Sequence, residues 1–191
     1  MRFWKNTHSF ILTAGLGVLL TACQGAADSN TYGFELAELD AILEDRQINI
    51  STRLDMRLSR PVREALDRGI PLTVEFVARH RQRDRWLSGI ENQIRTRWQI
   101  RYLPLSRHYA LSDLQSGQQE TFARFRHLQV RMNQVVLELP LASGSHGAHQ
   151  LEVKASLRLA SLPAPMRLPA LFSREWKLQS AWKKWQFELP A

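Results

Sequence analysis

Apolar and polar residues alternate along much of the chain. The clearest stretch runs from Ile48 to Ser59, where Ile, Thr, Leu and Met residues alternate with Asn, Ser, Arg and Asp residues. Such alternation is typical of a strand with one buried side and one solvent-facing side. The same pattern predicts strands within residues 72–85, 97–102, 151–159 and 176–189. The chain is therefore expected to consist mainly of half-buried β-strands.

The last of these segments changes the side on which its large residues fall. Two sets of alternating positions follow one another, first Trp176, Leu178, Ser180 and Trp182, and then Trp185, Phe187 and Leu189. A bulge near Lys183 and Lys184 would add one residue to the strand and produce this switch. The tryptophans are expected to pack in the core or at a sheet edge, because each indole buries a large area.

Two segments show a helical period instead. Residues 61–68 begin with proline, precede Gly69, and carry an apolar stripe of Val62, Ala65 and Leu66. Proline and glycine in these places commonly begin and end helices. A second helix is predicted from about Phe122 to Asn133, and residues 34–45 fit either a helix or a first strand. Together these elements predict a mainly β, sandwich-like antiparallel fold with two short helices, with an α+β fold as the alternative.

The first 22 residues have the parts of a secretory signal. Arg2 and Lys5 give a positive start, and the apolar stretch Phe10–Leu20 is shorter than the roughly 20 residues that span a bilayer. The stretch ends in Leu20-Thr-Ala-Cys23, which resembles the lipobox of bacterial lipoproteins. By that resemblance, Cys23 becomes the first mature residue and carries acyl chains that hold the protein on a membrane.

The residues around Cys23 predict how the chain is organised. Cys23 is the only cysteine, so the chain is expected to form no internal disulfide. Gln24 follows it instead of the aspartate that resembles an inner-membrane retention signal, which favours the periplasmic leaflet of the outer membrane. We expect a signal peptide over residues 1–22, a flexible tether over 23–33 and one β-rich domain over 34–191.

Positive charge is concentrated in one part of the chain. Lys and Arg number 26 against 18 Asp and Glu, and eight of the arginines lie between Arg79 and Arg107. Period two places alternating arginines on one strand face. The candidate anion-binding residues are Arg79, Arg81, Arg83, Arg85, Arg97 and Arg101. Arg95 shares this pattern, and Arg53 and Arg57 would extend the face if their strand were a neighbour.

A basic sheet face has two interpretations. Planar guanidinium groups make two-point contacts with phosphate or carboxylate, so the face could bind lipid headgroups, lipopolysaccharide, peptidoglycan or an acidic protein. Alternatively, it is a solvated sheet face that keeps the protein soluble and protects it from edge aggregation. Nucleic acid is not expected as a partner, because an exported, lipid-anchored chain does not normally meet it.

The sequence shows no recognisable catalytic motif. It has no Gly-x-Ser-x-Gly elbow or Gly-rich phosphate loop, and its acids show no evident catalytic pairing. His146 and His149 are closely spaced, but a metal site needs three or four ligands, so we expect neither metal nor cofactor. The favoured function is a non-enzymatic binding module at the cell envelope. A small-ligand or glycan module using Trp86 or Trp98, and an envelope hydrolase, are the alternatives.

Several short segments together resemble an uncharacterised bacterial domain family. They are Ala65-Leu-Asp-Arg-Gly-Ile-Pro-Leu72, Arg85-Trp86, Leu105-Ser-Arg-His-Tyr109, Leu162-Pro-Ala-Pro165 and Trp176-Lys-Leu-Gln-Ser-Ala-Trp182. Members of that family are exported or lipid-anchored and are often encoded beside a nitrogen-regulation-type sensor histidine kinase. The family often has an aspartate where this chain has Ala160, so no role of that aspartate is carried over. The resemblance implies a link to envelope sensing but no established activity.

Overall fold

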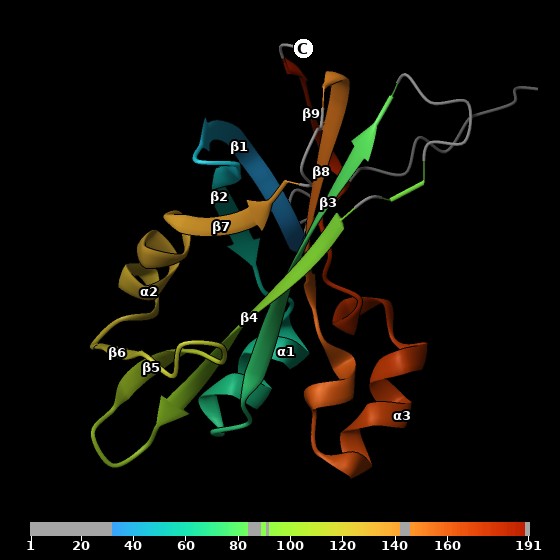
Figure 1. The fold of residues 1–191 in the computed structure, drawn as a ribbon. Coiled ribbons are helices and arrows are strands. Elements are labelled where there is room, and N and C mark those ends of the chain that lie inside the picture. The colour runs from blue at the N-terminus through green and yellow to red at the C-terminus, as the bar shows by residue number, and fades with distance from the viewer. Residues whose placement is uncertain (1–31, 84–88, 91, 142–145, 190–191) are drawn as a thin grey trace, which may run out of the picture.

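The computed structural model describes residues 32–83, 89–90, 92–141 and 146–189. The strands in these residues form two antiparallel sheets (Figure 1). One sheet has three strands in the order β1-β2-β7, and the other has six in the order β6-β5-β4-β3-β8-β9. The described part of the chain is therefore mainly β and antiparallel, as the alternating pattern predicts.

The three-stranded sheet contains β1 (Gly33–Glu44), β2 (Gln47–Arg57) and β7 (Val135–Pro140). The segment that fitted either a helix or a strand is therefore a strand. Asp45 and Arg46 join β1 to β2 with φ angles of 46° and 65°. A tight hairpin turn with positive φ at both central residues matches the twist of the strands that it connects.

The six-stranded sheet contains β3 (Leu72–Gln82), β4 (Asn92–Leu103), β5 (His108–Asp113), β6 (Gln119–Phe122), β8 (Gly147–Leu157) and β9 (Lys183–Leu189). The predicted strands correspond to β3, β4, β8 and β9. The sequence did not predict β5, β6 or β7. Each of these strands has only four to six residues, which is too short a run of alternation to recognise.

The helices are α1 (Arg60–Asp67), α2 (Phe125–Met132) and α3 (Ala164–Phe172), with short 3₁₀ turns η1 (Leu159–Ser161) and η2 (Arg174–Trp176). Helix α1 buries the predicted stripe of Val62, Ala65 and Leu66. The second helix starts later than predicted, because Phe122 is the last residue of β6. The prediction of two helices was incomplete, since α3 begins between two prolines and contains a third, Pro169.

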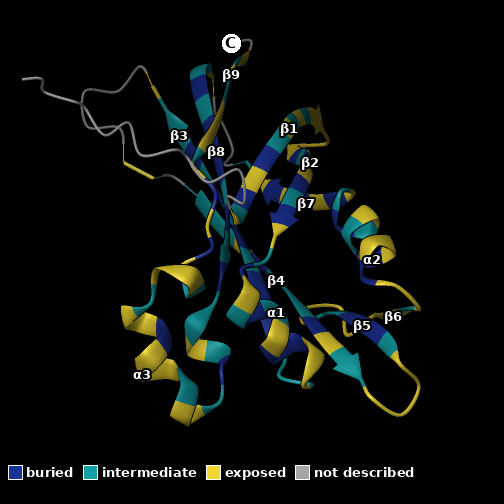
Figure 2. Cartoon of the chain, turned by 180° about the vertical axis from the view of Figure 1, so that it is seen from behind, coloured by how far each residue is buried: buried dark blue, intermediate teal, exposed yellow. Residues whose placement is uncertain are grey.

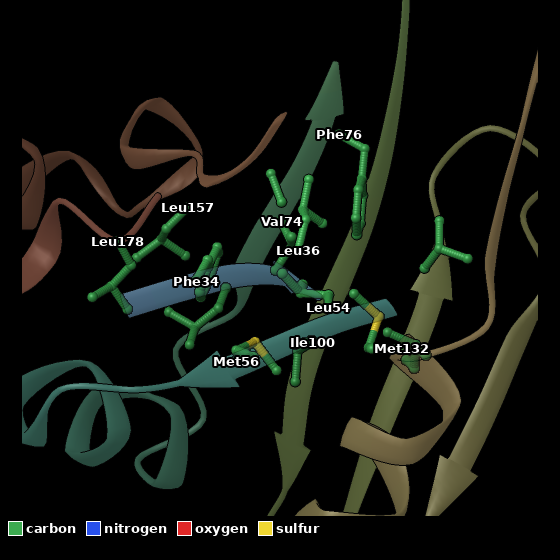
Figure 3. Close-up of a cluster of buried hydrophobic side chains, with 14 of the residues drawn as sticks. Phe34, Leu36, Leu54, Met56, Val74, Phe76, Ile100, Met132, Leu157 and Leu178 are labelled. Carbon is green, nitrogen blue, oxygen red and sulfur yellow. The ribbon is translucent and has the colours of Figure 1, made fainter. Parts of the chain in front are cut away.

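The core lies between the two sheets (Figures 2 and 3). Phe34 and Leu36 of β1 and Met56 of β2 lie with Val74 and Phe76 of β3 in one buried cluster. Burial alternates along β3. The residues of its inner side, each at most 1% exposed, are Leu72, Val74, Phe76, Ala78 and His80. Apart from the buried Thr73, the opposite side of β3 is partly exposed, so the outer side of the six-stranded sheet is a solvent-facing surface.

Residues 176–182 do not form the predicted strand. Trp176 ends η2, Gln179 forms only an isolated bridge to Ser156, and regular pairing with β8 begins at Lys183. The reason is one extra residue, which the switch of large residues from one side of the strand to the other had indicated. From Gln179 to Lys183 the chain advances four residues, while the paired residues of β8, from Ser156 to Val153, advance only three. The chain therefore bulges just before the predicted place.

Ser180 holds this bulge by two hydrogen bonds to one residue of β8. Its backbone N–H donates to the carbonyl oxygen of Ala155 at 2.8 Å, and its Oγ accepts from the Ala155 N–H at 3.0 Å. Ser180 is only 4% exposed. Because both polar groups of Ala155 are satisfied by Ser180, the chain can insert Ala181 without leaving a buried backbone group unpaired.

Candidate functional site: the arginine face

Strand register brings basic residues of three strands onto one surface. Arg97 of β4 lies opposite Glu75 of β3, and Arg79 of β3 lies opposite Glu152 of β8. Directly opposed residues of antiparallel strands point to the same side of a sheet. We call this outer side of the six-stranded sheet the arginine face. Its cations are Arg79, Arg81, Arg95, Arg97, Arg101, Lys154, Arg158 and Lys184, and its acids at the centre are Glu75 and Glu152.

Four of the candidate residues, Arg79, Arg81, Arg97 and Arg101, lie on this face. Arg83 follows the end of β3 and reaches the edge of this face, where its Nη1 donates to Oε1 of Gln186 on β9 at 2.9 Å. Arg85 lies outside the described residues, as do Cys23 and Trp86. The sequence pattern thus identified the face, although not all of its members.

Arg53 and Arg57 do not extend the arginine face. Both lie on β2, which belongs to the three-stranded sheet. Their guanidinium groups form ion pairs with Glu38 at 3.0 Å and Asp55 at 2.9 Å. The alternating pattern shows which residues of one strand share a side, but it does not show which strands are neighbours.

Glu75 binds two arginines at the centre of the face. Its Oε1 accepts from Nε of Arg97 at 2.8 Å and from Nη1 of Arg158 at 2.9 Å. The Glu75 side chain is 14% exposed. Burial acts to raise the pKa of Glu75, but the hydrogen bonds and charges of the two arginines outweigh it and hold the pKa below its usual value. Glu75 is therefore charged at neutral pH.

Glu152 is the second acid of the face and is bound less tightly. Its carboxylate lies 3.7 Å from Nε of Arg81 and 3.7 Å from Nζ of Lys184. Gln150 donates from Nε2 to Oε1 of Glu152 at 2.9 Å. Two of the cations therefore compensate this buried carboxylate at distances longer than a hydrogen bond.

The bulge at Ser180 turns Trp182 toward the arginine face. Continued from Lys183, the register sets Trp182 opposite Lys154, whose Nζ lies 5.8 Å from the centre of the indole ring. The guanidinium carbon of Arg79 lies 4.2 Å from the ring centre, a cation–π contact. Trp176 packs against the core cluster, whereas Trp182 lies half-buried on the outer side of the sheet, beside its edge strand β9.

Arg79 is also fixed from its other side, since its Nε donates to Oε1 of Gln93 at 3.0 Å. Arg95 and Arg101 are exposed, and neither has an acidic partner among the described residues. The two acids engage Arg97, Arg158, Arg81 and Lys184. Four cations thus remain for an external anion, namely Arg79, Arg95, Arg101 and Lys154.

The histidines that sequence singled out do not join this face. His149 lies on the inner side of β8, where its Nδ1 is 2.9 Å from Nε2 of His80 and its ring stacks on Phe187. His80 and His149 are 1% and 0% exposed, whereas His146 is exposed. The spacing of His146 and His149 therefore reflects one surface residue and one core residue. Within the described segments, no group of three His, Cys, Asp or Glu residues could hold a metal ion.

The structure gives little support to the alternative function, a small-ligand or glycan-binding module with an aromatic site. Trp98 is partly buried against the core cluster, with its Nε1 inaccessible. A groove of about 560 Å³ runs between β1, β2 and α2, and charged residues of both signs line it, including Glu35, Arg53 and Arg126. Because no aromatic residue lines this groove, it lacks the flat surface on which sugar rings stack.

A family profile described as a domain of unknown function, DUF4390, matches residues 32–186. The chain belongs to this family. The match includes every residue of the arginine face and the bulge that orients Trp182. Comparison with curated proteins and with solved structures found no match.

In this DUF4390 chain, two of the segments that carried the resemblance meet. Tyr109 donates from its hydroxyl to Oδ1 of Asp67 at 3.0 Å, and Arg63 donates to the same hydroxyl at 3.1 Å. Burial and the Asp67 carboxylate raise the pKa of Tyr109, while Arg63 opposes them. These residues join α1 to β5. A third segment, Trp176–Trp182, contains the bulge, so at least these parts of the resemblance serve the fold.

Proposed function

We propose that this DUF4390 chain is a non-enzymatic binding module of the bacterial envelope. Acyl chains on Cys23 hold it on a membrane, preferentially the outer membrane, with its β-rich domain facing the periplasm. The arginine face binds an anionic envelope component that carries phosphate or carboxylate groups, and the resemblance to chains encoded beside a sensor kinase suggests a context in envelope sensing. None of the described helices is long and apolar enough to cross a membrane.

One observation carries this proposal. The arginine face has four cations, Arg79, Arg95, Arg101 and Lys154, beyond those that engage its two central acids, and its one further acid among the described residues, Glu188, lies at the end of β9. A face that serves only for solubility usually mixes charges of both signs. Here the excess of one sign is spread over several neighbouring strands of one sheet surface, which favours an anionic partner with several charges.

The contacts of Arg79 support binding rather than mere solvation. Its guanidinium group lies against Trp182 and is hydrogen-bonded to Gln93. An arginine that is already ordered loses less side-chain freedom when an anion binds to it. Trp182 also adds an apolar surface next to the cations, so the site suits a partner in which charged groups alternate with rings or aliphatic chains.

Capture from cross-linked cell envelopes tests the proposal. The full-length acylated chain is compared with the Arg95→Gln/Arg101→Gln variant, which removes two exposed cations without breaking an ion pair of the face. The Arg124→Gln/Arg126→Gln variant is the matched control, since both residues are exposed on or beside α2.

We expect the wild-type chain and the control to recover the same component, and the arginine-face variant to lose it. Recovery should also fall as salt rises, because exposed charges are screened. Equal recovery by all three chains would contradict the proposal and would leave the arginine face as a solvated surface.

A further inference from the structure

Helix α3 carries apolar residues on two opposite sides. Ala170 is buried and Met166 packs against the core cluster. Leu168, Leu171 and Phe172 are 67%, 49% and 85% exposed, and their spacing places them on one side of a helix. We call these three residues the outer side of α3. A surface helix normally presents polar residues to water, so this apolar surface indicates a contact.

We propose that the outer side of α3 lies in the interfacial layer of the membrane to which Cys23 is attached. The inference rests on the lipid anchor of the proposed function and adds a second point of membrane contact. A lipid anchor alone would not fix how the domain is oriented on the membrane. Contact through α3 would instead fix its orientation and the direction in which the arginine face points.

Chain length places α3 within reach of the anchored membrane. Phe34, at the start of β1, lies beside Leu178 in the core (Figure 3). Phe172 precedes Leu178 by six residues, which span at most about 20 Å, and Cys23 precedes Phe34 by eleven residues, which span at most about 40 Å. The acyl chains and α3 can therefore contact one bilayer surface at the same time.

The charges around α3 favour a lipid surface. Arg167, Arg174 and Lys177 are exposed, and Glu175 is the only acid from residue 158 to 182. Leucine and phenylalanine with flanking basic residues are typical of helices that lie at a membrane interface, where the cations meet anionic headgroups.

The turn between β4 and β5 supports the same orientation. It lies at the same end of the molecule as α3 in both overall views (Figures 1 and 2). Leu105 in this turn is fully exposed, and the exposed Arg107 lies two residues further along the chain. An apolar tip and a cation at this end would contact the headgroup layer together with α3.

A second copy of the chain is a weaker candidate for this contact. Stable protein interfaces bury about 800 Å² on each partner, whereas the outer side of α3 consists of three side chains. Insertion into lipid needs no matching protein surface, and it is favourable for a small apolar area when an acyl anchor already holds the chain at the bilayer.

Fluorescence quenching in vesicles tests this inference on the full-length acylated chain. Ala164→Cys places a labelling site one turn before Leu168 without changing the three apolar residues, and Val136→Cys on β7 provides a control at 56% exposure. Each thiol carries an environment-sensitive nitrobenzoxadiazole dye. The vesicles contain phosphatidylethanolamine, phosphatidylglycerol and a spin-labelled quencher lipid.

We expect the quencher to reach the dye at position 164 and not the dye at position 136. Adding Leu168→Ser should lower the ratio of docked to undocked chain about tenfold, which corresponds to losing the partial insertion of one leucine side chain into the lipid. Mass spectrometry of the Cys23 peptide reports the acyl chains separately.

A missing acyl mass would overturn the anchor. An acylated, vesicle-bound chain with an unquenched dye at position 164 would overturn the docking of α3 and leave the anchor intact. A dye signal that depends on protein concentration without vesicles would show contact between copies, and it would also overturn docking on lipid.

Discussion

Replacing Glu75 by glutamine should weaken the fold and strengthen anion binding at the same time. The carboxylate of Glu75 accepts hydrogen bonds from Arg97 and Arg158 at 2.8 and 2.9 Å. Glutamine keeps the size of the side chain but not its charge, so both guanidinium groups become available on the arginine face. A purely structural role for this cluster would produce only the loss of stability.

The size of that loss follows from the exposure of the groups. A hydrogen bond to a charged group contributes about 1.5–3 kcal/mol, and an exposed ion pair about 0.2–1 kcal/mol. Glu75 is 14% exposed, but Arg97 and Arg158 are 40% and 34% exposed, so solvent screens both pairs. We expect Glu75→Gln to lower the free energy of unfolding by about 1–2 kcal/mol, and Tm by about 2–8 °C.

The stability difference should depend on pH in one direction. Folding lowers the pKa of Glu75 below its reference value of 4.5. A group with a lowered pKa contributes stability above its unfolded pKa, and this contribution is lost as pH falls through the folded pKa. The gap in Tm between the wild-type chain and Glu75→Gln should therefore be full at neutral pH and close in acid, below pH 4.5.

Binding is measured as the salt concentration that elutes the full-length chain, in detergent, from a heparin column. The control is Glu64→Gln, which removes a charge from an exposed ion pair with Arg60 on α1, away from the arginine face. We expect Glu75→Gln to elute at higher salt than Glu64→Gln. Equal elution of the two variants would refute the reasoning, because their net charges are the same.

Three further substitutions test the fold that carries the site, each by denaturant unfolding. Ser180→Ala should lower the free energy of unfolding by about 1–3 kcal/mol, because it leaves the buried N–H of Ala155 without its Oγ partner. An unchanged denaturant midpoint would contradict the role of Ser180 in holding the bulge. Gly69→Ala should cost about 1–2 kcal/mol, because φ is 86° there while the nearest atom to the new Cβ is 3.9 Å away. Leu66→Ala should lower the free energy of unfolding by about 2–5 kcal/mol, because Leu66 is fully buried. A smaller decrease would mean that α1 does not pack against the core as described.

The elements that sequence predicted are those with long, regular patterns. Strands β2 and β3 each have 11 residues of alternation, and α1 has proline and glycine at its ends. The 34–45 segment stayed ambiguous because Leu36, Leu39 and Leu43 also fit helical spacing. Helix α3 escaped prediction because Pro169 lies within it and its outer side is apolar, against the usual amphipathic pattern.

The candidate site could be predicted only as far as single strands allow. The alternating pattern along β3 and β4 showed that Arg79, Arg81 and Arg97 lie on one side of their strands. Strand order and register, however, depend on contacts between distant segments. For that reason the pairing of Glu75 with Arg97 was not foreseen. Trp182 was missed because one inserted residue at the bulge reverses the side on which every following residue lies.

Photocrosslinking from the middle of the arginine face tests the central claim most directly. Gln99 lies on β4 opposite Thr73, between Arg97 and Arg101 along the strand. A benzoylphenylalanine at position 99 is compared in living cells with one at Val136, which is exposed on the three-stranded sheet. Binding at the arginine face predicts a discrete adduct from position 99 that is missing from position 136 and is lost in the Arg95→Gln/Arg101→Gln variant. The absence of an adduct at position 99, or equal adducts from both positions, would contradict it.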